Sequence, residues 1–178
     1  MFTNNLFIKF VTFINVFFMA DVYLLTGGNL GDRIKNLHKA IELISKGAGK
    51  ITDRSSIYET EPWGFRHELN FLNQALKIDS LLDPLELLKE IFNIETILGR
   101  EKRSSTYSAR IIDIDILFYG NKIIKSDKLV IPHPKIHERM FTLTPMAELN
   151  PDFIHPELKK TIIQLKNECK DTKRVKKI

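Results

Sequence analysis

The sequence contains the segment Ile112-Asp113-Ile114-Asp115-Ile116-Leu117, which alternates apolar and acidic side chains. This period of two predicts a β-strand, because successive side chains of a strand point to opposite faces of the sheet. The isoleucines then share a core face, and Asp113 and Asp115 share the other face, roughly 7 Å apart. Two such carboxylates repel each other unless a cation lies beside them, and Mg²⁺ prefers hard oxygen ligands. We interpret the pair as a metal site; two solvated aspartates on an exposed strand are the alternative.

Outward from this strand, the chain alternates between strand and helix patterns. In chain order we expect a strand over 22–26, a helix over 34–44, strands over 50–60 and 71–78, and a helix over 84–98, with Asp83 as its N-cap and Pro84 at its first position. A small hairpin near Gly120-Asn121 and helices over 140–149 and 158–167 follow the acidic strand. The order β-α-β-β-α-β predicts an α+β fold with a ferredoxin-like core, an antiparallel sheet with helices packed on one face, plus extra C-terminal elements.

The bulk composition is that of an ordinary globular protein. The chain has 178 residues, 43% hydrophobic and 28% charged, which fits one domain with a real core. A net charge of +5 attracts anions such as nucleotides, nucleic acid or anionic lipid without choosing among them. The single cysteine, Cys169, excludes an intrachain disulfide, and we expect a cytoplasmic protein.

The two ends differ from the middle of the chain. Residues 1–18 are apolar but too short for a membrane span, which needs roughly 20 residues. We interpret Met19 as the start of translation and 1–18 as a leader that is either not translated or disordered; a membrane-associating leader is the alternative. We expect one domain over 19–169 and a basic, solvated and frayed tail over 170–178.

Cationic side chains precede and follow the acidic strand. Arg100, Lys102 and Arg110 lie in one polar loop before it, and His133 and Arg139 follow it. A polyphosphate needs a divalent cation together with arginines that give paired hydrogen bonds. The collective pattern therefore predicts a phosphoryl-transfer site, although each cation alone is typical of a solvated surface.

Two local motifs leave their roles open. The turn Gly27-Gly28-Asn29-Leu30-Gly31 follows a predicted strand and opens a helix, so it is either a phosphate cradle or a plain strand-to-helix turn. It lacks the Gly-Lys-Ser/Thr of a P-loop. His133 and His137 are four residues apart, as in some zinc sites, but Pro134 lies between them and no third ligand stands out.

Phe71 and Asn73 are two residues apart in a predicted strand and therefore share a face. Together with Phe141, which lies close to Arg139 in the sequence, they could sandwich and read a flat heterocycle. Ordinary core phenylalanines are the alternative.

Four blocks of the sequence, in order, resemble the 6-hydroxymethyl-7,8-dihydropterin pyrophosphokinases of folate biosynthesis. They are 23–33, 55–73, 110–117 and 131–141, and the resemblance runs from about Val22 to Pro156. It implies that 19–169 is a pyrophosphokinase domain that transfers the terminal diphosphate of ATP to the hydroxymethyl group of the dihydropterin and releases AMP. It also implies a monomer that binds these two substrates, with no nucleic-acid or membrane partner.

The resemblance also implies a role for each matching residue. The catalytic residues would be Arg100, Arg110, Asp113 and Asp115, and the two aspartates would bind two Mg²⁺ ions. The ATP-binding residues would be Glu95, Arg100, Lys102, Tyr107, Arg110, His133 and Arg139. The pterin-binding residues would be Thr60, Trp63, Phe71, Asn73 and Phe141, with the two phenylalanines stacking on the pterin.

Two other classes of protein share part of the pattern. A nucleotidyltransferase also combines a glycine turn with an Asp-x-Asp pair, but the two are usually close in sequence, whereas about eighty residues separate them here. An RNA-binding module fits the element order and the basic charge, but it needs stacking aromatics on its first and third strands. The first predicted strand lacks a suitable pair, and the two aspartates would repel phosphate.

Overall fold

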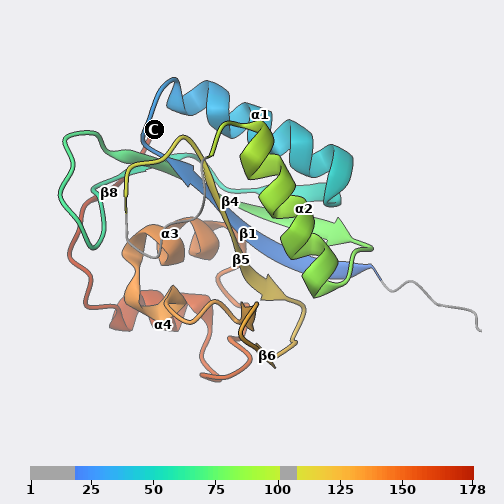
Figure 1. Ribbon diagram of the computed structural model, residues 1–178. Coiled ribbons are helices and arrows are strands. Elements are labelled where there is room, and N and C mark those ends of the chain that lie inside the picture. Colours follow the sequence, from blue (N-terminus) through green and yellow to red (C-terminus); the bar gives the residue numbers. More distant parts are fainter. Residues whose placement is uncertain (1–18, 101–107) are drawn as a thin grey trace, which may run out of the picture.

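The computed structural model describes residues 19–100 and 108–178, which form a sheet with helices on both sides (Figure 1). The main sheet contains β1 (Ala20–Gly28), β2 (Lys50–Arg54), β3 (Tyr58–Thr60), β4 (Phe71–Ser80), β5 (Asp113–Tyr119) and β8 (Val175–Lys177). All neighbouring strands pair antiparallel, in the order β5-β1-β4-β3-β8, and β2 pairs with β4. The short strands β6 (Ile124–Lys125) and β7 (Val130–Ile131) form a separate hairpin. The leader over 1–18 and the residues Lys102 and Tyr107 lie outside the described ranges.

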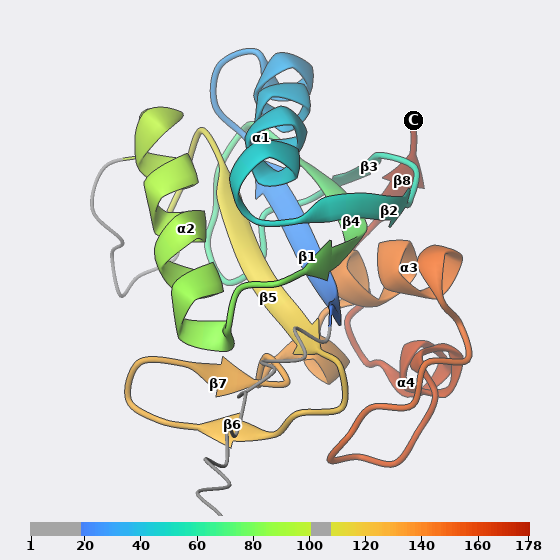
Figure 2. The ribbon, with the colours of Figure 1, turned by 90° about the vertical axis from the view of Figure 1, so that its right-hand side faces the viewer.

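The helices cover both faces of the sheet, not one as expected. They are α1 (Arg33–Gly47), α2 (Pro84–Ile97), the short 3₁₀ helix η1 (Ile136–Glu138), α3 (Met140–Leu149) and α4 (Ile162–Glu168). Helices α1 and α2 pack on one face, and α3 and α4 pack on the other (Figure 2). The expected antiparallel sheet with helices is confirmed, and a second apolar core under the C-terminal helices is added to it.

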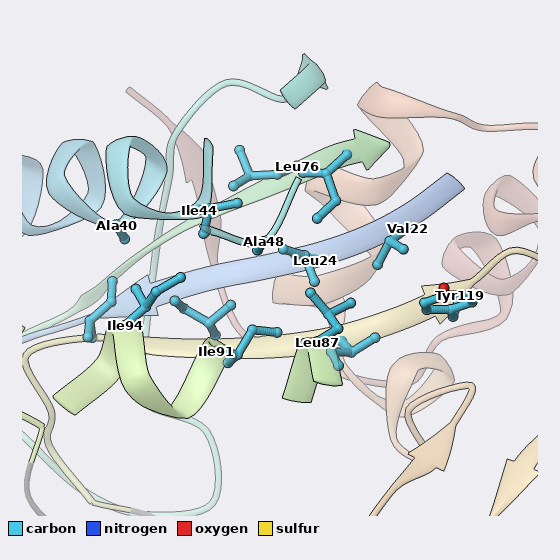
Figure 3. Close-up of a cluster of buried hydrophobic side chains, with 14 of the residues drawn as sticks. Val22, Leu24, Ala40, Ile44, Ala48, Leu76, Leu87, Ile91, Ile94 and Tyr119 are labelled. Atoms are coloured by element: carbon cyan, nitrogen blue, oxygen red, sulfur yellow. The ribbon is translucent and has the colours of Figure 1, made fainter. Parts of the chain in front are cut away.

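The first core lies between the sheet and helices α1 and α2 (Figure 3). Leu24 and Leu76 from the central strands meet Ile44 from α1 and Ile91 from α2, and all four are fully buried. Each such side chain contributes roughly 1.5–3 kcal/mol by leaving water. Ile114 of the acidic strand belongs to the same core, as its alternating pattern predicts.

A β-bulge interrupts the alternation of β5. Tyr23 pairs with Phe118 and Leu24 pairs with Ile116, so Leu117 is the extra residue. After the bulge, Leu117 and Phe118 both belong to the second core, under α3 and α4. A bulge leaves one residue without a partner and changes which way the following side chains point. The face of β5 that carries the acids therefore continues as an apolar face under α3.

Helix α2 begins where the sequence predicts it. The Asp83 carboxylate accepts hydrogen bonds from the backbone N–H groups of Leu85 and Glu86, and Pro84 occupies the first helical position. A side-chain acceptor satisfies donors that have no partner within the helix, and proline lacks one of those donors.

The predicted strand over 50–60 is in fact two strands, β2 and β3. Ser55 breaks it, because its hydroxyl accepts from Ala75 N at 3.0 Å and its carbonyl accepts from the Gln74 amide at 2.6 Å. The hairpin lies farther along than expected, at 124–131, and the last helix begins at Ile162, where Thr161 caps it. At Ser55 and at Thr161, side-chain hydrogen bonds to the backbone set boundaries that apolar periodicity does not show.

The expectation of a frayed tail is wrong. Val175–Lys177 forms β8 and pairs with β3, with Val175 opposite Thr60. The backbone N–H of Ile178 also donates to Ile57 O at 3.0 Å. Backbone pairing with an open sheet edge thus orders a segment whose composition alone suggests a solvated terminus.

Glu148, near the end of α3, connects that helix to β3 and β8. Its carboxylate accepts from Ser56 N and Oγ at 2.9 Å each, from the Tyr58 hydroxyl at 2.8 Å and from Lys177 Nζ at 2.8 Å. Burial acts to raise the pKa of this carboxyl, but the hydrogen bonds from Lys177, Tyr58 and Ser56 outweigh it and lower the pKa to about 2. Burial and the bond to Glu148 raise the pKa of Tyr58 to about 12.

Replacing Glu148 by glutamine should make the free energy of unfolding vary less with pH in the acidic range. The folded pKa lies below the ordinary value of 4.5, so the charged carboxylate stabilises the fold above that pH and loses its effect as the pH falls toward about 2. At pH 7 the Glu148→Gln variant should have a lower free energy of unfolding than the wild type, and the difference should shrink between pH 4.5 and 2 in urea titrations. Glu42→Gln, which removes an exposed pair with Lys46, is the control and should change little at any pH.

Candidate functional site

A cleft of ≈ 310 Å³ lies on the α3 side of the sheet, where β1 and β3 end and β4 and β5 begin. Eleven of the residues predicted for the site line it: Thr60, Trp63, Phe71, Asn73, Arg100, Arg110, Asp113, Asp115, His133, Arg139 and Phe141. They come from segments that are far apart in the sequence. The structure thus brings the acidic strand, the cations and the aromatic residues into one place.

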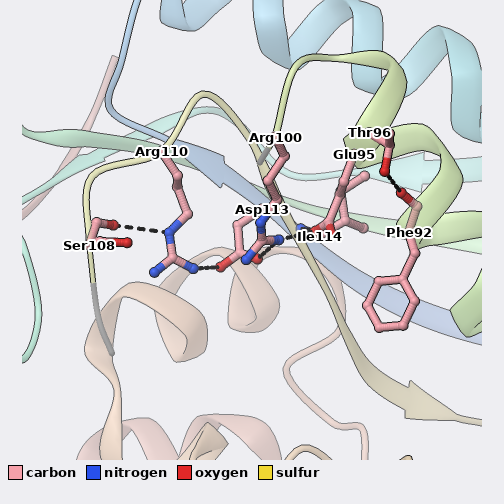
Figure 4. Close-up of polar contacts among 8 residues, drawn as sticks. All are labelled: Phe92, Glu95, Thr96, Arg100, Ser108, Arg110, Asp113 and Ile114. Carbon is pink, nitrogen blue, oxygen red and sulfur yellow. Dashed lines mark hydrogen bonds and ion pairs between the residues drawn. The ribbon is translucent and has the colours of Figure 1, made fainter. Parts of the chain in front are cut away.

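Asp113 lies between two guanidinium groups at the start of β5 (Figure 4). Arg100 donates to its Oδ1 and Arg110 donates to its Oδ2. Arg100 also donates to Glu95 Oε1, and the same Glu95 oxygen accepts from the backbone N–H of Ile114 at 2.7 Å. Charge-assisted bonds of this kind are stronger than neutral ones and fix the orientation of a planar guanidinium group.

Glu95 lies behind Arg100 and is not among the residues that line the cleft. Its side chain is only 3% exposed, and it reaches β5 from the last turns of α2. Burying a carboxylate is costly unless it is paired, and here a cation and a backbone N–H pair it. In this structure Glu95 therefore orients Arg100 and anchors the start of the acidic strand.

Asp113 and Asp115 both face the cleft, while Ile114 and Ile116 are buried in the first core. Among residues 19–100 and 108–178, no three His, Cys, Asp or Glu side chains gather as a metal site. A cation at this point would take two protein carboxylates and complete its shell with water and phosphate oxygens. That donor set fits Mg²⁺, which is usually held by one or two carboxylates and substrate phosphates.

The glycine turn holds the segment that leads into the acidic strand. Asn29 N and Leu30 N donate to Arg110 O at 2.9 and 3.1 Å, and the Asn29 side chain accepts from Arg110 N at 2.9 Å. A Cβ atom on Gly28 would lie 2.2 Å from Ile111 O. These N–H groups are used within the protein, so the turn anchors Arg110 rather than cradling a phosphate.

Asn73 and Thr60 form the polar part of the opposite wall. Both side chains are buried, and the Asn73 amide donates to Thr60 Oγ1 at 2.7 Å. Gly27 makes room for them, because a Cβ atom there would lie 2.3 Å from Asn73 Oδ1. Phe71 pairs with Thr60 across β3 and β4, and its ring is 6.1 Å from that of Phe65 at an angle of 89°.

Arg139 lies against two aromatic rings at the start of α3. Its guanidinium is 4.7 Å from the centre of the Trp63 ring and 5.5 Å from that of Phe141. The two rings are themselves 6.5 Å apart. Stacking of an arginine on an aromatic face is favourable, and it leaves the N–H donors, which lie in the plane of the guanidinium, directed to the sides.

Sequence reasoning missed several residues that line the cleft, among them Glu61, Phe65 and Lys135. Phe65 and Glu61 share a loop with Trp63, and Lys135 follows His133 by two residues, with its Nζ 5.5 Å from the Trp63 ring centre. Their closeness in sequence to Trp63 and His133 is the feature by which they could have been predicted. His137, the other half of the histidine pair, is not among the lining residues and lies 3.8 Å from Glu138.

The substitution Gly28→Ala should destabilise the protein, because the new methyl group meets the backbone carbonyl of Ile111, which has little room to move. We expect a loss of about 1–3 kcal/mol in the free energy of unfolding, measured by urea denaturation. Gly47→Ala is the matched control: its Cβ would also lie 2.2 Å from an oxygen, but that oxygen ends the flexible Glu90 side chain. Gly47→Ala should be neutral or stabilising, and equal losses in both variants would contradict the anchoring role of Gly28.

The sequence is also similar to a family of known proteins. The model of the family "7,8-dihydro-6-hydroxymethylpterin-pyrophosphokinase (HPPK)" matches residues 23–151. A protein of Aquifex aeolicus named 2-amino-4-hydroxy-6-hydroxymethyldihydropteridine pyrophosphokinase is 41% identical over 150 residues, 84% of this chain and 92% of that protein. A Bacillus subtilis protein of the same name is 41% identical over 128 residues, 71% of this chain and 76% of that one.

A solved structure of the wild-type Plasmodium falciparum HPPK-DHPS with SDX-DHP has the same fold, with a TM-score of 0.70 at 21% identity. The alignment covers 84% of this chain but 44% of that one, so this chain spans less than half of the Plasmodium protein. The fold, the family model and the relatives agree. The chain belongs to the 7,8-dihydro-6-hydroxymethylpterin-pyrophosphokinase family.

Proposed function

We propose that this protein transfers diphosphate from ATP to the hydroxymethyl group of 6-hydroxymethyl-7,8-dihydropterin, giving AMP and the pterin diphosphate for tetrahydrofolate biosynthesis. One observation carries the proposal: a carboxylate and guanidinium cluster at the start of β5 faces the same cleft as an aromatic and amide wall on β3, β4 and α3. The first is suited to a polyphosphate and the second to a flat heterocycle. Membership of the family supports this choice of substrates.

The cationic side of the cleft would hold ATP. Arg100 and Arg110 already point at Asp113, and each guanidinium has further N–H groups with which to bind phosphate oxygens. His133 and Arg139 line the same cleft, and Glu95 would act by holding Arg100 in place. Lys102 and Tyr107, which lie outside the described residues, complete the proposed ATP-binding set.

Asp113 and Asp115 would hold the Mg²⁺ ions, of which we propose two. Bound there, Mg²⁺ would neutralise phosphate charge and polarise the group that is transferred. The arginines line the same cleft, so phosphate would be attracted by the guanidinium groups as well as by cations held between the two carboxylates.

The aromatic side would bind the pterin. Phe71 and Phe141 would stack on its ring, and Asn73 would hydrogen-bond its edge, helped by the backbone around Thr60 and Trp63. The bond from Asn73 to Thr60 holds the amide in a fixed orientation before substrate arrives. Such preorganisation reduces the entropy that is lost on binding.

The reaction needs no covalent enzyme intermediate. The substrate hydroxyl would attack the β-phosphorus in line, and AMP would leave from the opposite side. Catalysis would then consist of positioning the two substrates and neutralising charge. The catalytic set would be Arg100, Arg110, Asp113 and Asp115.

We also propose a ferredoxin-like plan for the core of the fold. The strand order β5-β1-β4-β2, with α1 and α2 as crossovers on one face, supports it. No helix in the described part of the chain has the length and hydropathy needed to cross a bilayer. We propose a cytoplasmic monomer with no nucleic-acid or membrane partner.

The nucleotide product tests the proposed function directly. The purified chain, incubated with ATP, Mg²⁺ and the hydroxymethyldihydropterin, should form AMP and the pterin diphosphate in equal amounts, as measured by chromatography. Free diphosphate instead of AMP would indicate nucleotidyl transfer. No pterin-dependent product of either kind would refute the proposal.

Removing one carboxylate should abolish the reaction without unfolding the protein. Asp115→Ala should lower AMP formation by at least about a hundredfold, because it removes a proposed metal ligand. Circular dichroism should show an unchanged fold. Asp127→Ala, in the loop of the β6–β7 hairpin, is the control and should retain activity. Wild-type turnover by Asp115→Ala would show that the metal assignment is wrong.

A further inference from the structure

Helix α3 starts at the cleft without a cap from its own N-terminal residue. Arg139 occupies the N-cap position, and arginine has five N–H donors but no acceptor. It therefore cannot accept from the first backbone N–H groups of the helix, which have no partner within the helix. Instead its guanidinium lies over Trp63 and Phe141.

The acceptor comes from the C-terminal tail. Asp171 Oδ2 accepts from Met140 N, the first residue of α3, at 3.0 Å. Its other oxygen, Oδ1, accepts from Lys173 N at 3.1 Å. A carboxylate at a helix N-terminus is favourable both as an acceptor and because it complements the positive end of the helix dipole.

The same tail touches the cleft wall at two more points. Lys173 Nζ lies 3.7 Å from Glu61 Oε2, and Val175 pairs with Thr60 as β8 runs beside β3 (Figure 2). Glu61 and Thr60 both line the cleft. The pair between Lys173 and Glu61 is largely exposed and contributes little. Asp171 is therefore the contact whose loss should matter most.

We propose that Asp171 is a positioning residue for the cleft. By capping α3 from outside the helix, it allows a residue that cannot cap, Arg139, to occupy the N-cap position and turn its guanidinium toward Trp63. It also fixes the first turn of α3, from which Phe141 faces the cleft. Asp171 lies beyond the region 23–151 that the family model matches.

The single tryptophan makes this inference testable without substrate. Trp63 is the only tryptophan in the chain, and it lies beside both Arg139 and Phe141. Asp171→Ala should shift the emission of Trp63 in the ligand-free protein, because the neighbouring cation and ring move. The second readout alone rests on the reaction proposed above: kcat/KM should fall by about three- to tenfold, which is what the loss of stability from one missing helix cap corresponds to if it all appears as misalignment of the cleft.

Two further variants separate positioning from general loss of stability. Asp171→Asn keeps an oxygen acceptor and should restore most of the wild-type emission and kcat/KM. Thr161→Ala removes the cap of α4 and should lower the unfolding midpoint to a similar extent while leaving both readouts unchanged. Should Asp171→Ala not fold, Asp171→Glu, which displaces the same carboxylate, takes its place with the same expected changes.

The outcomes are distinguishable. Wild-type emission and kcat/KM in Asp171→Ala would overturn the positioning role, and so would equal changes in Thr161→Ala. If the wild-type chain shows no turnover, the proposed function fails, and the emission of the same variants still decides whether Asp171 positions Arg139 and Phe141.

Discussion

The carboxylate of Asp113 is held between the guanidinium groups of Arg100 and Arg110, and the cationic half of the cleft depends on this arrangement. Two arginines this close would repel each other without a shared anion. Asp113 and the buried Glu95 supply the negative charge, and Glu95 also ties α2 to the backbone of β5. The cluster is therefore balanced before any ligand arrives, and its donors are already directed toward one place.

The two walls of the cleft pack closely against the backbone of β1, at two glycine positions. Gly28 lets β1 approach the carbonyl of Ile111, and Gly27 leaves space for the amide of Asn73. Strand β1 thus separates the charged wall on β5 from the amide and aromatic wall on β4. Neither wall could approach β1 as it does if these two positions carried side chains.

The sequence predicts those parts of the molecule that local chemistry determines. The alternation over 112–117 predicts which side chains of β5 enter the core, and Asp83 with Pro84 marks the start of α2. Most of the residues predicted for the site line one cleft, and most of them lie in the four blocks of sequence that resemble one family in the same order. Their chemical roles remain proposals.

The remaining features depend on partners far away in the sequence. The pairing of β8 with β3 and the three hydrogen bonds from Ser56 and Tyr58 to Glu148 join segments about ninety or more residues apart, and no local pattern of charge or hydropathy encodes them. The bulge at Leu117 likewise follows from its register with β1, not from its own identity.

Strand β8 is the last in the order of the main sheet, and an outermost strand can recruit a strand from another molecule. This one is short, three residues long, and carries Lys176 and Lys177. Lysines on an outermost strand disfavour its pairing with a second chain, since their charges would have to be brought together or desolvated. We therefore expect Lys176 and Lys177 to disfavour edge-to-edge pairing at this edge of the sheet.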